Sequence, residues 1–249
     1  TAYRNWLTKP GATCGRYSFL SATLHYFAFL LPAFGLPEEI SIRIAVQVHK
    51  GAFAVMADID LKEAINAVSD VVQNRPRAIR EFDQIYMKTG DMVMQSEFVA
   101  RWADGKRLVF IGDGDAISVC VAYFKTRGVV DHGPTKITVL DFDERIVKAI
   151  TRFADKERIE HLDARLYNVL DGLPEDLPGY DRFYTNPPWG QYNEGFSVKL
   201  FSQRGIEALK NVGEGMIVIA DDDEIPWPQQ VLGSVQRSAA EKGFFVCRM

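Results

Sequence analysis

Short runs of β-branched and aromatic residues alternate with helical patterns over the C-terminal part of the chain. The runs are Arg107–Gly112, Lys136–Asp141, Tyr180–Asn186, Gly215–Asp221 and Gly243–Arg248. Apolar residues recur at helical intervals over the segments between them, which are Ala116–Arg127, Glu144–Asp155, Ser197–Asn211 and Pro228–Lys242. Strands that alternate with helices are typical of βαβ units. The pattern therefore predicts an α/β domain over residues 106–249, with a Rossmann-like parallel sheet that helices cover on both faces.

Helical periodicity also covers three segments ahead of this domain, residues 17–31, 38–53 and 60–73. Asp60 is a candidate N-cap for the third segment. These segments predict a small helical domain over residues 1–77 that serves packing or dimerisation, because short apolar helices mostly bury core surface. A polar break follows, and residues 78–105 are predicted to form linker helices. The chain stops within an apolar run, so we expect it to be cut from a longer protein.

The composition fits a globular protein and excludes several classes. The 249 residues are 47% hydrophobic and carry a formal net charge of -4, with no basic stripe, so a nucleic-acid partner is not favoured. The three cysteines lack any CxxC spacing, which argues against a metal site. The longest apolar stretch, residues 17–34, is interrupted by His25 and Pro32 and is too polar for a membrane span. We expect a cytoplasmic protein with no metal and no membrane association.

Polar residues collect where the predicted strands end. In open α/β sheets, ligands bind beyond the carboxyl ends of the strands. Those ends carry the segments Gly112–Asp115, Asp141, Asn186–Trp189 and Asp221–Glu224. The four segments together predict one ligand site at the carboxyl edge of the sheet.

The turn after the first predicted strand has the features of a sulfonium-binding site. Gly112 and Gly114 let a ligand approach the backbone closely, and Asp141 follows 27 residues after Gly114, a spacing that suits a carboxylate bound to ribose hydroxyls. Position 117 is isoleucine, so the GxGxxG of dinucleotide-binding turns is incomplete. Asp113 and Asp115 favour a cationic donor of the S-adenosylmethionine type, and hence a sheet of the class I methyltransferase type. The alternative is that these acids only cap the following helix.

Asn186-Pro187-Pro188-Trp189 is the most specific local motif in the chain. Its prolines fix φ and lack N–H groups, which leaves rigid carbonyl oxygens. A carboxamide oxygen and a proline carbonyl can together accept both hydrogens of an amine, and an indole can stack on a planar or cationic substrate. The motif predicts chemistry at an amine nitrogen, with Asn186, Pro187 and Trp189 as catalytic residues. The alternative is a Pro-Pro turn beside a core tryptophan.

Four acids in a row, from Asp221 to Glu224, follow the run that begins at Gly215. Such a run of like charges forms either a solvated loop or a groove that attracts ammonium groups. The pattern alone leaves both interpretations open.

Segments spread over residues 75–249 match the motifs of one enzyme family. They are Arg75-Pro76, Glu81-Phe82-Asp83-Gln84, Gly112-Asp113-Gly114-Asp115, Ile137–Arg145, Leu173-Pro174, Leu200-Phe201 and Arg204–Leu209. Together they resemble the branched-chain polyamine synthases, also called N4-bis(aminopropyl)spermidine synthases. The resemblance implies a small N-terminal domain, a Rossmann-like C-terminal domain, and transfer of aminopropyl groups from decarboxylated S-adenosylmethionine to a polyamine nitrogen.

The resemblance also implies roles for the candidate residues. Asp141 would hold the donor's ribose and Asn168 the edge of its adenine. Asp113 and Asp115 would orient or deprotonate the attacking amine. The residues expected to bind a small cationic amine substrate are Glu81, Asp83, Asp221, Asp222 and Asp223.

Two positions depart from the family pattern. Gly114 stands where the family has an acid, and Asn186–Trp189 stands where the family has Asp-Pro-Pro-Glu. Asn-Pro-Pro-aromatic resembles instead the motif of methyltransferases that act on an exocyclic amino group of a base or on a glutamine amide. Three hypotheses stay open: aminopropyl transfer, N-methylation from S-adenosylmethionine, and a catalytically silent binding module.

Overall fold

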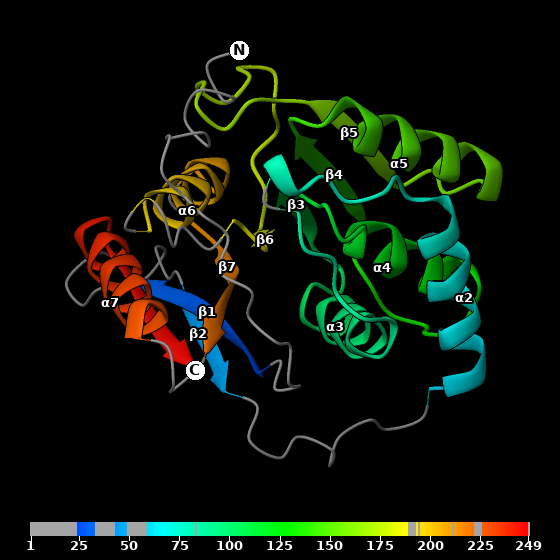
Figure 1. Ribbon diagram of the computed structural model, residues 1–249, viewed down its shortest axis with the longest axis horizontal. Coiled ribbons are helices and arrows are strands. Elements are labelled where there is room, and N and C mark those ends of the chain that lie inside the picture. Colours follow the sequence, from blue (N-terminus) through cyan, green and yellow to red (C-terminus); the bar gives the residue numbers. More distant parts are fainter. Residues whose placement is uncertain are drawn as a thin grey trace.

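The structure, a computed structural model, describes residues 24–32, 43–48, 59–82, 84–188, 193, 195–210, 212–221 and 226–248. The framework of this part of the chain is one eight-stranded sheet (Figure 1). Its strands are β1 (Leu24–Pro32), β2 (Arg43–Val48), β3 (Arg107–Ile111), β4 (Lys136–Asp141), β5 (Leu162–Leu166), β6 (Arg182–Thr185), β7 (Glu214–Asp221) and β8 (Phe244–Arg248). Their order is β1-β8-β2-β7-β6-β3-β4-β5, and β3 to β7 run parallel.

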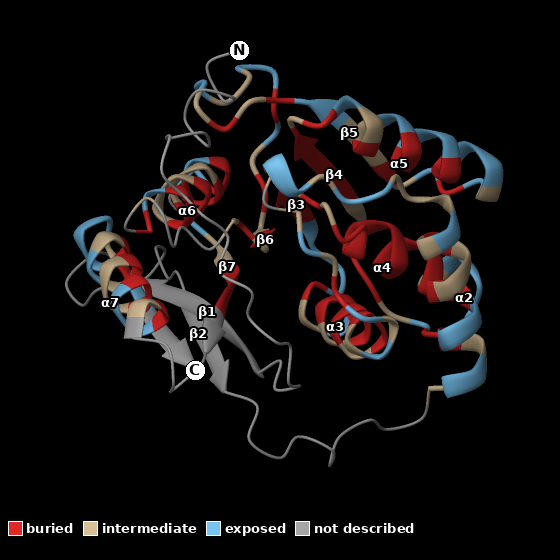
Figure 2. Cartoon of the chain, viewed as in Figure 1, coloured by how far each residue is buried: buried red, intermediate tan, exposed pale blue. Residues whose placement is uncertain are grey.

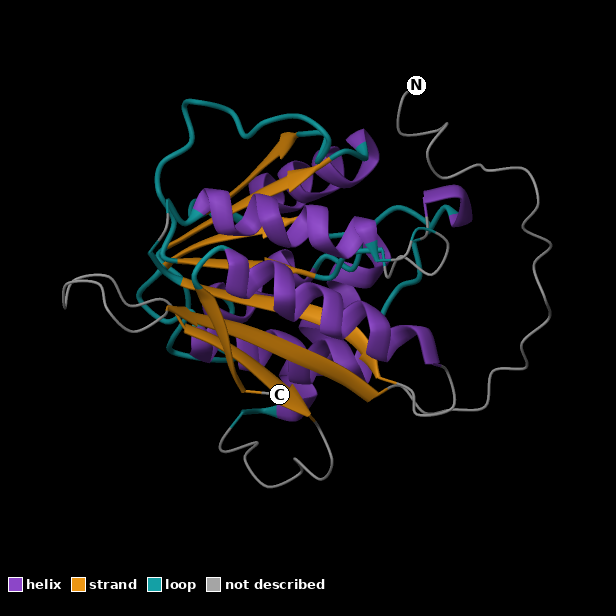
Figure 3. Cartoon of the chain, turned by 90° about the vertical axis from the view of Figure 1, so that its left-hand side faces the viewer, coloured by secondary structure: helices purple, strands orange, loops and turns teal. Residues whose placement is uncertain are grey.

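Helices cover both faces of this sheet. They are α2 (Leu61–Asn74), α3 (Thr89–Trp102), α4 (Ile117–Thr126), α5 (Glu144–Glu157), α6 (Phe196–Ala208) and α7 (Pro226–Glu241), with the short turn η1 (Arg80–Phe82) ahead of α3. In Figure 1, α2 to α5 lie to the right of the sheet and α6 and α7 to its left; Figure 3 gives the view from the side of α6 and α7. None of the helices in the described segments is long and apolar enough to cross a membrane.

The helices differ in how completely they are buried (Figure 2). α5 buries one face through Ile146, Ile150 and Phe153, and its first turn is capped by the carboxylate of Asp143. α4 is buried from Ile117 to Phe124, because α2, α3 and α5 pack around it. The turn between β3 and α4 is therefore held by a helix that is packed on every side.

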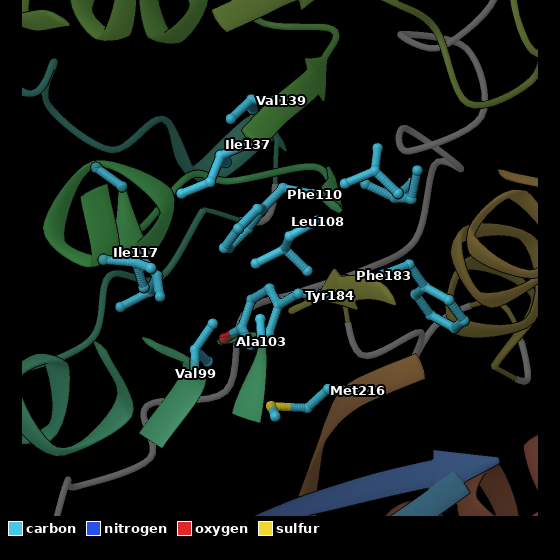
Figure 4. Packing of buried hydrophobic residues seen from close by; sticks show 14 of the residues in the cluster. Val99, Ala103, Leu108, Phe110, Ile117, Ile137, Val139, Phe183, Tyr184 and Met216 are labelled. Carbon is cyan, nitrogen blue, oxygen red and sulfur yellow. The ribbon is translucent and has the colours of Figure 1, made fainter. Parts of the chain in front are cut away.

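The core lies between the central strands and the helices on each side. Phe110 of β3 and Tyr184 of β6 are fully buried, with ring centroids 4.8 Å apart (Figure 4). On the other face of β6, a Cβ added to Gly205 or Gly215 would lie 2.3 or 2.0 Å from the ring of Phe183. Since real Cβ contacts are never this short, glycine at these two positions is what lets α6 and β7 close on Phe183.

The strand order places a topological switch point between β3 and β6. From β3 the chain continues to β4 on one side, while β6 lies on the other side. Loops that leave such a pair of strands diverge and open a crevice at the carboxyl edge of the sheet. The two most informative sequence segments, Gly112–Asp115 and Asn186–Pro188, are these loops.

The predicted Rossmann-like sheet and its helices are confirmed, with two corrections. Residues 24–32 and 43–48 form strands, so the helices predicted over 17–31 and 38–53 are wrong in these described segments. Short apolar runs have no decisive period, and β1 and β2 find partners in β7 and β8 that no local pattern shows. β5 was not predicted, because its five residues lack a strong apolar pattern.

The structure contains the helix predicted over residues 60–73 and helical turns within the predicted linker. α2 and its N-cap are confirmed, since the Asp60 side chain accepts hydrogen bonds from the N–H groups of Lys62 and Glu63. η1 and α3 occupy the segment predicted as linker helices. The domain boundaries at residues 77 and 105 stay predictions.

Candidate active site

The turn after β3 packs closely against α6 at its first position, Gly112. Gly112 has φ of 73°, and an added Cβ would lie 3.0 Å from the ring of Phe201 on α6. Its N–H donates to the carbonyl of Leu140 at 2.8 Å, which ties the turn to the end of β4. Glycine is thus favoured here by both conformation and space.

Asp141, the last residue of β4, joins two turns. One carboxylate oxygen accepts the N–H of Asp113 and the other accepts the N–H of Asp143, each at 2.8 Å. Burial raises the pKa of Asp141 to about 6. Each carboxylate oxygen can accept a second hydrogen bond, so Asp141 keeps capacity for two hydroxyl donors.

Asp113 caps α4. Its Oδ1 accepts the N–H of Ile117 at 2.9 Å, and its Oδ2 accepts the N–H and the hydroxyl of Ser118 at 3.0 and 2.5 Å. Burial raises the pKa of this carboxyl well above its usual value. These contacts support the capping interpretation of Asp113.

Asp115 makes the contact that joins the two loops. Its Oδ2 accepts Nδ2 of Asn186 at 2.7 Å, and its Oδ1 accepts the N–H of Met87 at 2.6 Å. Asp115 is only 5% exposed. The carboxylate therefore links the turn after β3, the motif after β6 and the segment ahead of α3.

Arg75 and Tyr86 form a layer over this turn. Nη1 of Arg75 donates to the carbonyl of Asp115 at 2.9 Å, and the guanidinium lies 4.2 Å from the centroid of the Tyr86 ring. The same ring lies 3.5 Å from a Cβ built on Gly114. The Tyr86 hydroxyl is buried without a hydrogen-bond partner among the described residues, and burial raises its pKa to about 12.

A polar network holds the segment that carries Tyr86 and Met87. Gln84 donates to Asp143 at 2.9 Å and accepts the N–H of Ile79 at 2.9 Å. Asp143 also pairs with the guanidinium of Arg145 at 2.5 Å. The segment is thereby fixed to the start of α5, which places the Met87 N–H beside Asp115.

The motif after β6 is anchored at both ends. The hydroxyl of Thr185 donates to the carbonyl of Ile111 at 2.7 Å, which ties β6 to β3. The carbonyl of Pro188 accepts the hydroxyl of Ser197 at 2.8 Å, which ties the motif to α6. Asn186 lies between these anchors and its amide is turned to Asp115.

Asn168 lies in the loop after β5, next to Asp141. The N–H of Tyr167 donates to the carbonyl of Asp141 at 2.8 Å, and the Asn168 side chain accepts the N–H of Leu170 at 3.0 Å. Nε of Arg204 donates to the carbonyl of Val169 at 3.0 Å and holds this loop from α6. The predicted adenine-edge residue thus borders the predicted ribose residue.

The structure gathers only part of the predicted site. It brings together Gly112, Asp113, Gly114, Asp115, Asp141, Asn168, Asn186 and Pro187 at the carboxyl edge. Glu81 is exposed on η1, where no hydrogen bond or ion pair between described residues joins it to them, and Asp221 ends β7. Asp83, Trp189, Asp222 and Asp223 lie outside the described residues.

Sequence reasoning missed Tyr86 and Met87. Met87 contributes only its backbone N–H, which every residue except proline carries, so no side-chain pattern could reveal it. Tyr86 lies two residues after Gln84 in a segment noted only for its resemblance, and its contact to Arg75 depends on folding. No group of three or more potential metal ligands occurs among the described side chains.

A Rossmann-like sheet with a glycine turn, an acid ending the next strand and an amide-bearing motif at the switch point defines a methyltransferase-type α/β domain. The sequence-family model that describes the branched-chain polyamine synthase A C-terminal domain matches residues 63–246 of this chain. The chain therefore belongs to the family of branched-chain polyamine synthase C-terminal domains.

Individual relatives agree with this family. The N(4)-bis(aminopropyl)spermidine synthase of Thermus thermophilus is 31% identical over 146 residues, covering 57% of this chain and 38% of the relative. That of Thermococcus kodakarensis is 28% identical over 154 residues, covering 61% and 41%. The crystal structure of the Thermus thermophilus branched-chain polyamine synthase, in complex with N4-aminopropylspermidine and 5'-methylthioadenosine, matches with a TM-score of 0.58 at 25% identity, covering 72% and 48%. The chain thus spans less than half the length of each of these relatives.

Proposed function

We propose that this chain transfers an aminopropyl group from a decarboxylated S-adenosylmethionine-type donor to an amine nitrogen of a polyamine. Family membership over residues 63–246 supports this proposal, as do the ligands named for the Thermus thermophilus relative. The single observation in this chain that supports it best is the hydrogen bond between Asp115 and Asn186, because it joins the donor-side turn to the motif that would receive the amine.

The residues at the carboxyl edge suit an adenosyl donor. At Gly112 the ring of Phe201 occupies the space of a side chain, so this glycine serves the packing of α6 on the turn, and the proposed donor contacts are those of Asp141 and Asn168. The carboxylate of Asp141 accepts backbone N–H groups, and its remaining lone pairs would accept the ribose hydroxyls. Asn168 borders Asp141 and would meet the edge of the adenine.

The proposed reaction moves one bond at carbon. The lone pair of a neutral amine attacks the methylene carbon of the aminopropyl group that is bonded to the sulfonium sulfur. That carbon–sulfur bond breaks and its electron pair stays on sulfur, so the donor leaves as the thioether 5'-methylthioadenosine. The nitrogen gains a carbon and then loses a proton to solvent. The side-chain oxygen of Asn186 and the carbonyl of Pro187 would accept the N–H groups and aim the lone pair. Asp221 and the acids after it stay the sequence-predicted partners of the acceptor's remaining amines.

N-methylation from S-adenosylmethionine is the second candidate. One observation favours it: Asn186 presents a neutral amide, as in motifs that bind a planar amino group, where the synthase motif has an acid. The two candidates differ in the donor's carboxylate and in the group transferred, so a single assay separates them.

The test is to incubate the purified chain with spermidine and either decarboxylated S-adenosylmethionine or S-adenosylmethionine, and to identify the products by mass spectrometry. We expect aminopropylated spermidine and 5'-methylthioadenosine from the decarboxylated donor. Asp141→Asn should lose product, whereas Glu144→Gln, a matched change at a carboxyl that is 64% exposed on α5, should not. Methylated product from S-adenosylmethionine alone would overturn the proposal in favour of the second candidate.

A further inference from the structure

We propose that Asp115 and Asn186 act as one specificity-determining pair, in which the buried carboxylate fixes the amide so that the acceptor nitrogen meets a neutral oxygen. This inference rests on the proposed transfer to an amine. It assigns Asp115 the role of a positioning residue, where the family resemblance implies a base or a direct contact to the amine.

The direction of the Asn186 amide is fixed by its partner. Oδ2 of Asp115 accepts a hydrogen bond from the Asn186 side chain, and the amide has its donors at one end only, so the contact determines which end of the carboxamide turns toward Asp115. At 2.7 Å from Oδ2 of Asp115, that end must be Nδ2 of Asn186. The Asn186 oxygen therefore lies on the other side of the amide carbon, turned away from the carboxylate.

Asp115 itself cannot turn away. Its other oxygen accepts the Met87 N–H at 2.6 Å, and its own carbonyl accepts Arg75 at 2.9 Å. Arg75 is in turn stacked on Tyr86. Asp115 is thus held at its carboxylate by Met87 and at its backbone by Arg75, and this fixed carboxylate orients Asn186.

The pair also sets the charge that the acceptor nitrogen meets. Bonded to a carboxylate, the amide of Asn186 is polarised, so its oxygen is a stronger acceptor than a free amide oxygen yet carries no net charge. A carboxylate in its place would bind an ammonium group strongly, and an ammonium group has no lone pair with which to attack. The arrangement selects an acceptor nitrogen that arrives deprotonated. Asp115, one hydrogen bond further back, stabilises the positive charge that appears on nitrogen as the new bond forms.

This chain offers a precise swap as a test. In Asp115→Asn combined with Asn186→Asp, the introduced amide at position 115 can accept the Met87 N–H through its oxygen and donate to the introduced carboxylate at position 186. Both hydrogen bonds persist, and only the negative charge moves to the side that faces the acceptor. Either single substitution breaks the pair: an asparagine at position 115 has one oxygen for two donors, and an aspartate at position 186 sets two carboxylates at 2.7 Å.

We expect each single variant to lower kcat by about 10- to 100-fold, because the amide or carboxylate loses its fixed orientation. The double swap should have a kcat at least about tenfold higher than that of the worse single variant. It should also lower KM for spermidine, because a carboxylate now faces the cationic amine. The wild type should show kcat/KM rising with pH through the pKa of the acceptor amine, and the swap should show a flatter profile. The proposal is wrong if the double swap has a kcat no higher than that of the worse single variant. It is also wrong if KM for spermidine and the pH profile of the double swap equal those of the wild type.

A measurement that does not depend on activity separates the proposed pair from two other causes of lost activity, misfolding of a variant and failure of the proposed function. The side-chain amide of Asn186, assigned by ¹⁵N NMR through its loss in Asn186→Asp, should shift in Asp115→Asn and should be protected from exchange in the wild type. No shift would refute the pair even if transfer occurs. A shift without any aminopropyl transfer would leave the pair standing and remove the proposed function.

Discussion

The turn after β3 and the motif after β6 meet at one hydrogen bond, yet different parts of the chain hold each in place. In the turn, the carboxylates of Asp113 and Asp115 accept backbone N–H groups, and the N–H of Asp113 donates to Asp141 at the end of β4. In the motif, Asn186 depends on a side-chain hydrogen bond, and the two prolines that follow donate no N–H. These hydrogen bonds of the turn each have a backbone N–H on one side, whereas the hydrogen bond of Asn186 to Asp115 has a side chain on both sides and changes when either residue is substituted.

The family resemblance implies two departures from the family pattern, one in each region. Asn186, which by that resemblance stands where the family has an acid, belongs to the contact that has a side chain on both sides. The other departure, Gly114, falls at the position of the turn where a side chain fits: an added Cβ would only touch Tyr86 at 3.5 Å. At Gly112, by contrast, any side chain would be strained by the positive φ and would press on the Phe201 ring at 3.0 Å.

The largest expected effect is at the hydrogen bond where the two loops meet. Asp115→Ala should lower turnover by about 10²-fold, because Asn186 and the Met87 N–H both lose their acceptor. Steady-state kinetics measure the loss. Asp131→Ala, at a fully exposed acid in the loop after α4, is the control. Near-normal turnover in Asp115→Ala would show that the two loops work independently.

The next effect is a pH dependence at Asp141. Its pKa is raised to about 6, so the protonated carboxyl is stabilised by folding, and binding of ribose hydroxyls requires the ionised form. Affinity for 5'-methylthioadenosine, measured by calorimetry, should therefore fall below pH 6 by up to about tenfold per pH unit. A flat profile in the wild type would contradict the assignment of Asp141 to the ribose.

The raised pKa of Asp141 also predicts that the stability of the protein changes with pH in the opposite direction to its affinity for the ligand. Because the folded-state pKa lies above the usual 3.8, the contribution of Asp141 to stability is largest below pH 4 and is lost as pH rises to about 6, by roughly 3 kcal/mol. Asp141→Asn should remove this dependence. The difference in unfolding free energy between the two proteins at pH 4 and pH 7 measures it.

A smaller effect is expected at Asp113, where the turn uses a carboxylate for capping. Asp113→Ala should lower the free energy of unfolding by about 1–2 kcal/mol through the lost cap of α4, with turnover of the folded protein changed less than about tenfold. Asp113→Asn keeps one acceptor and should cost less. If Asp113→Ala stays folded but inactive, Asp113 belongs to the chemistry and the contrast with Asp115 fails.

The smallest effect is expected at Tyr86. Its hydroxyl is buried without a partner among the described residues, so Tyr86→Phe should leave stability unchanged or raise it by up to about 1 kcal/mol, with turnover nearly unchanged. Tyr86→Ala, which removes the ring beneath Arg75, should be clearly worse in both. Thermal unfolding of the two variants checks this. A damaging Tyr86→Phe would mean that the hydroxyl contacts the substrate.

Local patterns predict the regular part of the fold well, because the period of apolar residues differs between strand and helix. β4 begins and ends at the predicted residues, α5 begins at the predicted Glu144, and Asp60 caps α2 as its residue type indicates. β1 and β2 were predicted as helices, since a short apolar run satisfies either period until a partner strand is known. In the candidate site, the residues that follow predicted strands were predicted, whereas Tyr86 and Met87, which follow no strand, were not.

By itself, the sequence determines that a glycine turn, an acid and an amide motif lie at the carboxyl ends of parallel strands, because alternating strands and helices leave their loops at one edge. Only the tertiary structure decides which of two acids, Asp113 and Asp115, caps a helix and which meets the motif. Asp115 lies 71 residues from Asn186 and 28 from Met87 along the chain. Hydrogen bonds over such separations depend on how β3, β6 and α3 pack, and no local spacing encodes that packing.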